Sequence, residues 1–156
     1  MIVYSDNNSY ELLIENIDNQ ILRQVYLNLG IDLDKAMEIP AGNIISVKNY
    51  ASFFRILFNA SYLNPPSSNE LLDMLTRTTF KKGLVAGVGQ GTTIAHKFGE
   101  RYFSDTFERQ LHDCGIVYSP QKPYLVCIMT RGTDLNSLTQ SIKAISSTIF
   151  QHWQDL

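Results

Sequence analysis

Two short stretches of this sequence carry side chains that can do chemistry. The first is Lys97-Phe98-Gly99-Glu100, which follows the strand-forming run Thr93-Ile94-Ala95-His96. A lysine ammonium supplies positive charge, and a glycine beside it leaves backbone N–H groups open to a ligand. The second is Ser5-Asp6-Asn7, which combines a hydroxyl, a carboxylate and an amide. The two stretches predict one polar site if the fold brings them together.

The composition limits what such a site can serve. The 156 residues suit one domain, and 44% of them are hydrophobic and 18% charged, as in globular proteins. The net charge of −2 argues against a nucleic-acid partner, because phosphate binding needs a basic surface. No apolar run approaches the length that spans a bilayer, and the first residues do not resemble a signal peptide. We therefore expect a globular domain without a membrane segment.

The elements that must position the site fall into two parts. Up to residue 80 the apolar residues have helical spacing, which predicts a mainly helical part at 1–80. The helices expected there run from Tyr10 to Ile17, from about 20 to Leu29 with Gly30 after its end, from a cap at Ser46 to Phe58, and from a cap at Asn69 to about 75. Residues 31–45 are expected to form an irregular loop, and 64–68 a stop between helices.

The second part, residues 81–156, is expected to hold a sheet and a last helix. Strands are predicted at 92–98, 111–118 and 124–130, with 99–110 as a long connection, and short connections favour antiparallel pairing. The last helix has an apolar stripe that should lie on the sheet. Its members are Leu138, Ile142, Ile145, Ile149 and Trp153. Helices, then three strands, then one helix predict a single α+β domain over 1–156.

The cysteines and histidines are the candidate redox and metal-binding groups. A hairpin about Pro120-Gln121 places Cys114 opposite Cys127, which allows a disulfide, although we expect two reduced, packed thiols. His96 and His112 lie on adjacent expected strands, but two histidines without a carboxylate cluster make a poor metal site. Structural roles are therefore expected for both, with no metal and no cofactor.

The glycine-rich stretch 87–92 also invites a functional interpretation. Its spacing does not match a phosphate-binding loop, and it precedes a strand, whereas such a loop opens a helix. We expect a plain connection.

Taken in order, these elements resemble the serine β-lactamase and penicillin-binding transpeptidase superfamily, and its class A-like members most closely. Ser5-Asp6-Asn7 is similar to the family's S-D-N element, and Ala95-His96-Lys97-Phe98-Gly99 to its K-T-G strand. The similarity continues through 80–87, 112–118 and 123–132, so it runs from Ser5 to the end. The resemblance implies part of a β-lactamase/transpeptidase-like fold that uses neither metal nor organic cofactor.

The resemblance also implies a role for each matching residue. Ser5 would relay a proton to the leaving amine, and Lys97 would supply positive charge to Ser5 and to a substrate carboxylate. The Asn7 amide would hold a substrate carbonyl. Gly99 would keep the strand edge open, and the backbone N–H of Glu100 would be one oxyanion donor.

The sequence departs from the family pattern at three points. The family's S-x-x-K nucleophile segment stands well ahead of S-D-N, and only four residues precede Ser5, so no nucleophile is expected in this chain. Phe98 replaces the family's threonine or serine, a substrate-binding position whose hydroxyl would bind a carboxylate. No E-x-x-x-N stretch occurs in 31–45, where Glu38 is the nearest acid. Asp6 would be structural, through buried hydrogen bonds.

The resulting hypothesis is the C-terminal part of a periplasmic or extracellular serine hydrolase. The parent would act on β-lactams or D-Ala-D-Ala-type cell-wall peptides through an acyl-enzyme, and this chain alone would be inactive. Its missing N-terminal segment, or a second copy, would cover apolar surface that this chain exposes. One alternative is a non-catalytic binding module that has lost the nucleophile. Another is a globular domain whose matches are accidental.

Overall fold

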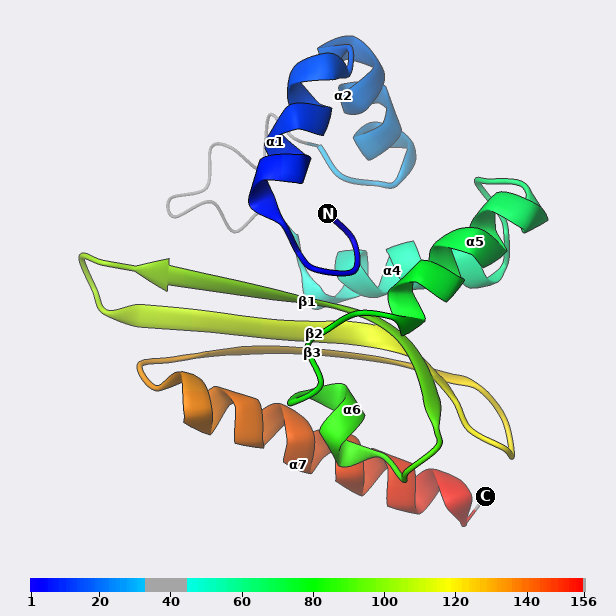
Figure 1. The fold of residues 1–156 in the computed structure, drawn as a ribbon, viewed down its shortest axis with the longest axis vertical. Helices are drawn as coiled ribbons and strands as arrows, with labels where there is room; N and C mark the ends of the chain where they lie inside the picture. The colour runs from blue at the N-terminus through cyan, green and yellow to red at the C-terminus, as the bar shows by residue number, and fades with distance from the viewer. Residues whose placement is uncertain (33–44, 156) are drawn as a thin grey trace.

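A three-stranded sheet lies between two layers of helices in the computed structural model, which describes residues 1–32 and 45–155 (Figure 1). The strands are β1 (Thr93–Phe103), β2 (Glu108–Tyr118) and β3 (Tyr124–Gly132). The helices are α1 (Asn7–Asn16), α2 (Asn19–Asn28), α4 (Val47–Phe58), α5 (Pro65–Thr76), α6 (Leu84–Gly87) and α7 (Leu135–Gln154). In Figure 1, α1, α2, α4 and α5 lie above the sheet, and α6 and α7 lie below it. The predicted α+β architecture, with its C-terminal helix on the sheet, is confirmed.

The sheet is antiparallel throughout, in the order β1-β2-β3. The predicted hairpin about Pro120-Gln121 is confirmed, since Cys114 pairs with Cys127. The two cysteines form a disulfide, with Cα atoms 4.0 Å apart, so the expectation of reduced thiols was wrong. Direct cross-strand partners bring two Cβ atoms close enough for that bond.

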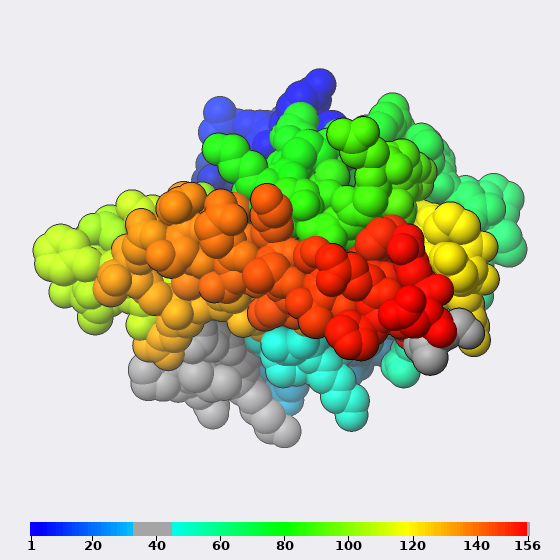
Figure 2. All heavy atoms as spheres, turned by 90° about the horizontal axis from the view of Figure 1, so that it is seen from below, coloured from blue at the N-terminus to red at the C-terminus, as the bar shows by residue number. Residues whose placement is uncertain are grey.

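The first hairpin is longer than the sequence indicated. Residues 99–110 are not a long connection, because β1 continues to Phe103 and β2 begins at Glu108. This end projects beyond α7 (Figure 2), so it lacks the apolar alternation that marks a half-buried strand. Arg109 holds it together instead, through an ion pair with Glu100 at 3.2 Å and a contact 4.6 Å from the centre of the Tyr102 ring.

Alternate residues along each strand serve two separate cores. The lower core lies between the sheet and helices α6 and α7. It includes Leu84, Ile94, Leu111, Val117, Val126, Ile142 and Phe150. The upper core lies against α4 and α5 and contains Phe54, Leu72, Leu75, Ala95, Cys114 and Ile116. In α7, Ser146 is buried against α6, where its hydroxyl donates to the Leu84 carbonyl at 2.9 Å. Its neighbour Ile145, which was expected to face the sheet, is 43% exposed.

Side-chain caps fix most helix starts. Ser46 caps α4 as predicted, and Gly30 follows α2 with a φ of 78°, which suits glycine. Helix α5 starts earlier than expected. Asn64 caps it, and prolines occupy its first positions, where no backbone donor is needed. The expected stop at 64–68 is therefore the first turn of α5.

Two further starts also differ from the prediction. Helix α1 begins at Asn7 rather than at Tyr10. The short helix α6, which was not expected, ends at Gly87, the first residue of the stretch 87–92 that was expected to be a plain connection. Every residue of α1 and α2 is at least partly exposed. The exposed fractions of Leu12 and Ile21, for example, are 65% and 62%. These two helices therefore leave their apolar side chains uncovered.

Candidate functional site

Ser5 and Lys97 meet at the open edge of β1. The Lys97 Nζ donates hydrogen bonds to the Ser5 hydroxyl and to the Phe98 carbonyl, the latter at 2.9 Å. The N-terminal segment comes down to β1 ahead of α1 (Figure 1), so residues 92 positions apart become neighbours. Both residues are half-buried. The two stretches that the sequence singled out thus form one site.

The Ser5 turn is held from both sides. Before it, the Val3 carbonyl accepts hydrogen bonds from the backbone N–H and the hydroxyl of Thr79, at 3.1 and 3.4 Å. After it, the Asp6 carboxylate caps α1 by accepting from the N–H of Ser9 at 2.8 Å and from its hydroxyl. Ser5 itself has a φ of 53°, a left-handed conformation that is uncommon for serine. The two anchors keep its hydroxyl aimed at Lys97.

Asp6 has a structural role and Asn7 is open to a ligand, but Asp6 is not buried as predicted. The hydrogen bonds of Asp6 are structural, but they lie at the surface and not in the interior as predicted. Those bonds to Ser9 hold the pKa of the Asp6 carboxyl below its ordinary value. Asn7 is the first residue of α1 and is exposed, on the same turn as Ser5. Its amide is therefore accessible to a ligand.

Hydroxyl groups from the helical layer fix β1 beside the site. The Tyr50 hydroxyl donates to the Lys97 carbonyl at 2.6 Å, and Thr78 donates to the His96 carbonyl at 2.7 Å. No local pattern in the sequence indicates the polar contact of Tyr50. Contacts of this kind join segments that are distant along the chain.

A buried hydrogen-bonded pair supports β1 from below. His96 Nδ1 lies 2.8 Å from Asp113 Oδ1, and neither side chain is exposed. The other oxygen of Asp113 accepts from the backbone N–H of Leu84 at 3.0 Å. His96 therefore has the structural role that the sequence predicted. His112 points to the opposite face of the sheet, so the two histidines do not form a metal pair.

Metal binding has no other support in the described ranges, where no group of three or more His, Cys, Asp or Glu side chains is arranged to hold an ion. None of the helices in those ranges has the length and hydropathy that crossing a membrane requires.

Burial governs the charge state of Lys97. Partial removal from water lowers the pKa of its ammonium, because a charged group is less stable there, and the Asp113 carboxylate partly opposes the shift. Lys97 therefore loses its proton more readily than an ordinary lysine. That property suits a group that exchanges a proton with a neighbouring hydroxyl.

The strand edge is open past Lys97. The carbonyls of His96 and Phe98 both bond to side chains outside the sheet, so by the two-residue period the N–H of Glu100 also faces outward. In the described part of the chain, no heavy atom lies within 4 Å of where a Cβ on Gly99 would be. The Glu100 side chain turns instead to Arg109. A ligand can thus approach the backbone here.

Sequence comparison identifies the family to which this arrangement belongs. The model of the beta-lactamase enzyme family matches residues 1–153. The chain belongs to the beta-lactamase enzyme family. Members of this family are serine β-lactamase-like hydrolases, and the open edge of β1 is where this member carries its Ser5–Lys97 pair.

Solved structures with the same fold cover nearly all of this beta-lactamase family chain. PBP-A matches with a TM-score of 0.78 and 24% identity, over 100% of this chain and 59% of its own. A β-lactamase from Sphaerobacter thermophilus DSM 20745 matches with a TM-score of 0.80 and 21% identity, over 99% of this chain and 61% of its own. A class A β-lactamase of the last common ancestor of Gram-negative bacteria matches with a TM-score of 0.78 and 20% identity, over 97% of this chain and 62% of its own. This family member thus spans about three fifths of their length. A search of curated proteins found no match.

The expectation that the chain holds no S-x-x-K spacing was wrong, because this beta-lactamase family chain contains one at Ser119-Pro120-Gln121-Lys122. It lies in the turn between β2 and β3, where the Ser119 hydroxyl donates to Gln121 at 2.7 Å. Cys114 is the cross-strand partner of Lys97, and Ser119 lies five positions after Cys114, just past the end of β2. Five residues of extended strand span roughly 16 Å, so Ser119 is about that far from the site. It cannot act with the Ser5–Lys97 pair. Glu38 lies outside the residues that the structure describes.

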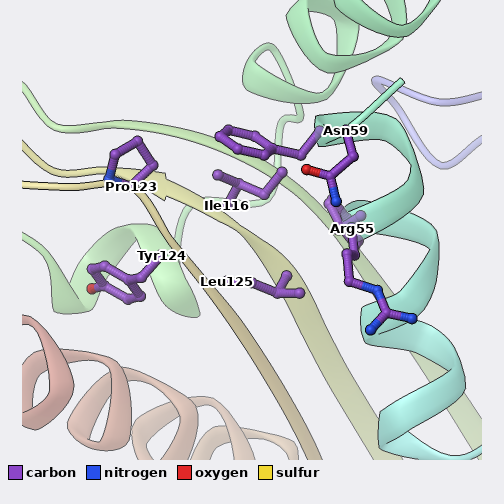
Figure 3. Close-up of a pocket in the computed structure, with 8 residues that line it drawn as sticks. Arg55, Asn59, Ile116, Pro123, Tyr124 and Leu125 are labelled. Carbon is purple, nitrogen blue, oxygen red and sulfur yellow. The ribbon is translucent and has the colours of Figure 1, made fainter. Parts of the chain in front are cut away.

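Away from the site, α4 and β3 enclose an apolar groove of about 190 Å³. Figure 3 shows Arg55 and Asn59 of α4 on one side, with Leu125 of β3 facing them. The Ser5–Lys97 pair takes no part in it. A second apolar hollow, of about 250 Å³, does reach the site, since Ile2, Tyr50 and Lys97 are among its lining residues.

Proposed function

We propose that this chain supplies the proton relay and the substrate-binding strand of a serine hydrolase whose nucleophile lies outside this sequence. Its substrates would be β-lactams or D-Ala-D-Ala-type cell-wall peptides, cleaved through an acyl-enzyme. The observation that carries the proposal is the hydrogen bond from Lys97 to Ser5, which joins the two matched elements in one half-buried site. Family membership supports the reaction class.

The roles follow from the geometry of the edge. When the amide C–N bond breaks, the leaving nitrogen needs a proton, which the Ser5 hydroxyl gives while Lys97 replaces it. The lowered pKa of Lys97 makes that replacement easier. The outward N–H of Glu100 stabilises the developing oxyanion, and the exposed Asn7 amide N–H donates to a substrate carbonyl. Gly99 adds no side chain that would block this approach.

The missing nucleophile requires a partner segment. We propose that it is the N-terminal segment of the parent protein, or failing that a second copy of this chain. The uncovered apolar residues of α1 and α2 and the groove between α4 and β3 support this, because exposed apolar surface of this kind marks an interface (Figure 3). β3 is also an edge strand of the described sheet, and an edge strand can pair with a strand of another segment.

The disulfide supports a periplasmic or extracellular location for the parent. Disulfides persist in oxidising compartments and are rare in the cytosol. Cys114 and Cys127 are paired in this chain.

The test uses benzylpenicillin, because a structurally similar protein, the L158E mutant of PBP-A at 25% identity, forms an acyl-enzyme complex with penicillin G. We expect intact-mass measurement to show no covalent adduct on this chain, and ligand-observed NMR to show reversible binding. Lys97→Ala should weaken binding about tenfold, whereas Lys122→Ala in the distant turn should not. A stoichiometric adduct would overturn the assignment of the nucleophile to another segment. Equal binding by wild type and Lys97→Ala would overturn the site.

A non-catalytic binding module is the second candidate. It is favoured by Phe98, which has no hydroxyl for a substrate carboxylate, and by the position of the one S-x-x-K spacing in a turn. Coding DNA upstream of Met1 separates the two. An in-frame S-x-x-K segment supports the hydrolase, and a stop codon immediately upstream supports the module.

A further inference from the structure

A groove of about 750 Å³ opens beside the strand edge that carries Lys97. It reaches from that edge to the first turns of α7, which Figure 2 shows in orange beside the green segment around α6. Two of its lining residues connect it with the site. Phe80 stacks on Phe98 with ring centroids 4.4 Å apart, and Glu100 carries the backbone N–H that faces outward at the edge. A ligand held at Lys97 can therefore extend into the groove.

The groove has an apolar floor and room for several residues of a peptide. Leu111 and Thr139 are buried, and Phe80 and Leu135 are half-buried. The Thr139 hydroxyl donates to the Leu135 carbonyl at 2.8 Å, so its hydrogen bond stays within α7. Ligand sites have volumes of about 300–1,000 Å³, and a single carboxylate fills only a small part of such a space. A ligand that occupies this groove is therefore much longer than the reacting amide.

Lysines outnumber acids around the groove. Its charged lining residues are Lys81, Lys82, Lys143, Glu100 and Asp134. Both acids already have partners on the protein. Glu100 pairs with Arg109 at 3.2 Å, and the Asp134 carboxylate caps α7 by accepting from the Ser137 N–H at 2.7 Å. Arg109 and the start of the helix thus offset the negative charge before any ligand arrives.

The lysine ammonium groups have few partners on the protein. Lys81 donates to the Thr76 carbonyl at 3.4 Å, which is long for a hydrogen bond. Within residues 1–32 and 45–155, Lys82 and Lys143 have neither a hydrogen bond nor an ion pair. Each ammonium has three N–H donors and binds a carboxylate well. Because Lys82 and Lys143 come from different segments and line one groove, they can hold two acidic groups of the same ligand.

We infer that this groove binds an acidic peptide segment of the substrate, with Lys82 and Lys143 as the residues that select it. The inference rests on the proposed function and narrows it. Of the two substrate classes, cell-wall peptides are long enough to reach from Lys97 into the groove, and compact β-lactams are not. Lys82 and Lys143 therefore determine specificity at a distance from the reacting amide.

The experiment compares two peptides that carry the same N-terminal fluorescein. One is Ala-Glu-Ala-Glu-D-Ala-D-Ala, and the other has glutamine in place of both glutamates. Fluorescence polarisation measures the binding of each to this chain. We expect the acidic peptide to bind about tenfold more tightly, because it adds two partly exposed charge pairs of modest strength. Added sodium chloride should reduce the difference, since salt screens such pairs.

Two double variants locate the effect. K82A/K143A should abolish the preference for the acidic peptide and leave the binding of benzylpenicillin unchanged. K48A/K122A is the matched control, because Lys48 and Lys122 are also exposed and their loss removes the same charge, but neither lines the groove. It should keep the preference.

The outcomes separate this inference from the proposed function. Equal binding of the two peptides by wild type would overturn the inference and leave the proposed function standing, as would binding of benzylpenicillin alone. A preference that survives in K82A/K143A, or that is lost equally in K48A/K122A, would also overturn it. Failure of benzylpenicillin and both peptides to bind would overturn the proposed function itself. The wild-type comparison needs no variant, so it tests the inference even if a variant does not fold.

Discussion

Lys97 and Cys114 are direct cross-strand partners, and Cys114 is bonded to Cys127 in the third strand. The three residues form one row across the face of the sheet that bears the site. Cys114 is fully buried. The disulfide therefore fixes the spacing of β2 and β3 directly beside the strand that carries Lys97.

Reduction of this disulfide should lower stability. The bond closes a loop with a sequence separation of 13, and cross-linking a loop of this length removes unfolded-state entropy worth roughly 3 kcal/mol. We expect dithiothreitol to lower the free energy of unfolding in urea by about that amount. The variant C114A/C127A should show the same curve with and without reductant. If unreduced, unfolded protein is alkylated at both cysteines, the bond does not exist in solution.

Two glycines on neighbouring strands should respond oppositely to alanine. A Cβ on Gly115 would lie 2.5 Å from the Ala95 carbonyl oxygen and 2.5 Å from His96 Cβ, so β1 and β2 would have to separate. We expect Gly115→Ala to cost about 1–3 kcal/mol or more, as overpacking does.

Gly99→Ala is the matched comparison. A Cβ there meets open space among the described residues, and alanine restricts the unfolded chain, so stability should stay level or rise by about 0.4–1 kcal/mol. Thermal and urea unfolding of both variants measure the difference. Equal destabilisation by the two substitutions would contradict the register of β1 and β2.

Local signals explain what the sequence could predict about the fold. The start of α4 was predictable because a capping serine and the apolar spacing agree at Ser46. The start of α5 was not, because Pro65 and Pro66 resemble a stop although they suit a first turn. The extension of β1 was missed because its outer end is exposed and is held by ion pairs and by contacts between arginines and aromatic rings.

The site was predictable only in part for a related reason. Ser5 and Lys97 belong to short sequence motifs, so both residues could be predicted from the sequence as members of one site. Tyr50 and Thr78, which fix the strand through hydroxyl contacts, lie in segments that meet β1 only in the folded protein. The stacking of Phe98 on Phe80 also depends on tertiary packing.

Loss of the Asp113 carboxylate should lower the stability of the protein. Asp113 pairs with His96 and accepts from the Leu84 N–H, and all of this is buried. Removing one partner of a buried pair leaves the other unsatisfied, so Asp113→Ala should cost roughly 3–5 kcal/mol.

Asp113→Asn keeps the shape and an acceptor for Leu84, and it should cost less than Asp113→Ala. Asp105→Ala, at an exposed turn position, should change stability by less than about 0.5 kcal/mol. Urea unfolding at neutral pH compares the three variants. A cost for Asp113→Ala no larger than that for Asp105→Ala would show that the pair contributes nothing.

The ammonium of Lys97 should lose its proton below the ordinary lysine pKa of 10.5, because burial lowers its pKa. Between the folded-state pKa and 10.5 the unfolded chain binds more protons than the folded one. The contribution of Lys97 to the unfolding free energy therefore rises with pH across that window. The ¹³Cε shift of labelled lysine, assigned by its absence in Lys97→Arg, follows the titration directly. Asp113→Asn removes the charge that opposes the shift, so it should lower the midpoint further. A Lys97 midpoint at or above 10.5 in the wild type would contradict the lowering of its pKa by burial.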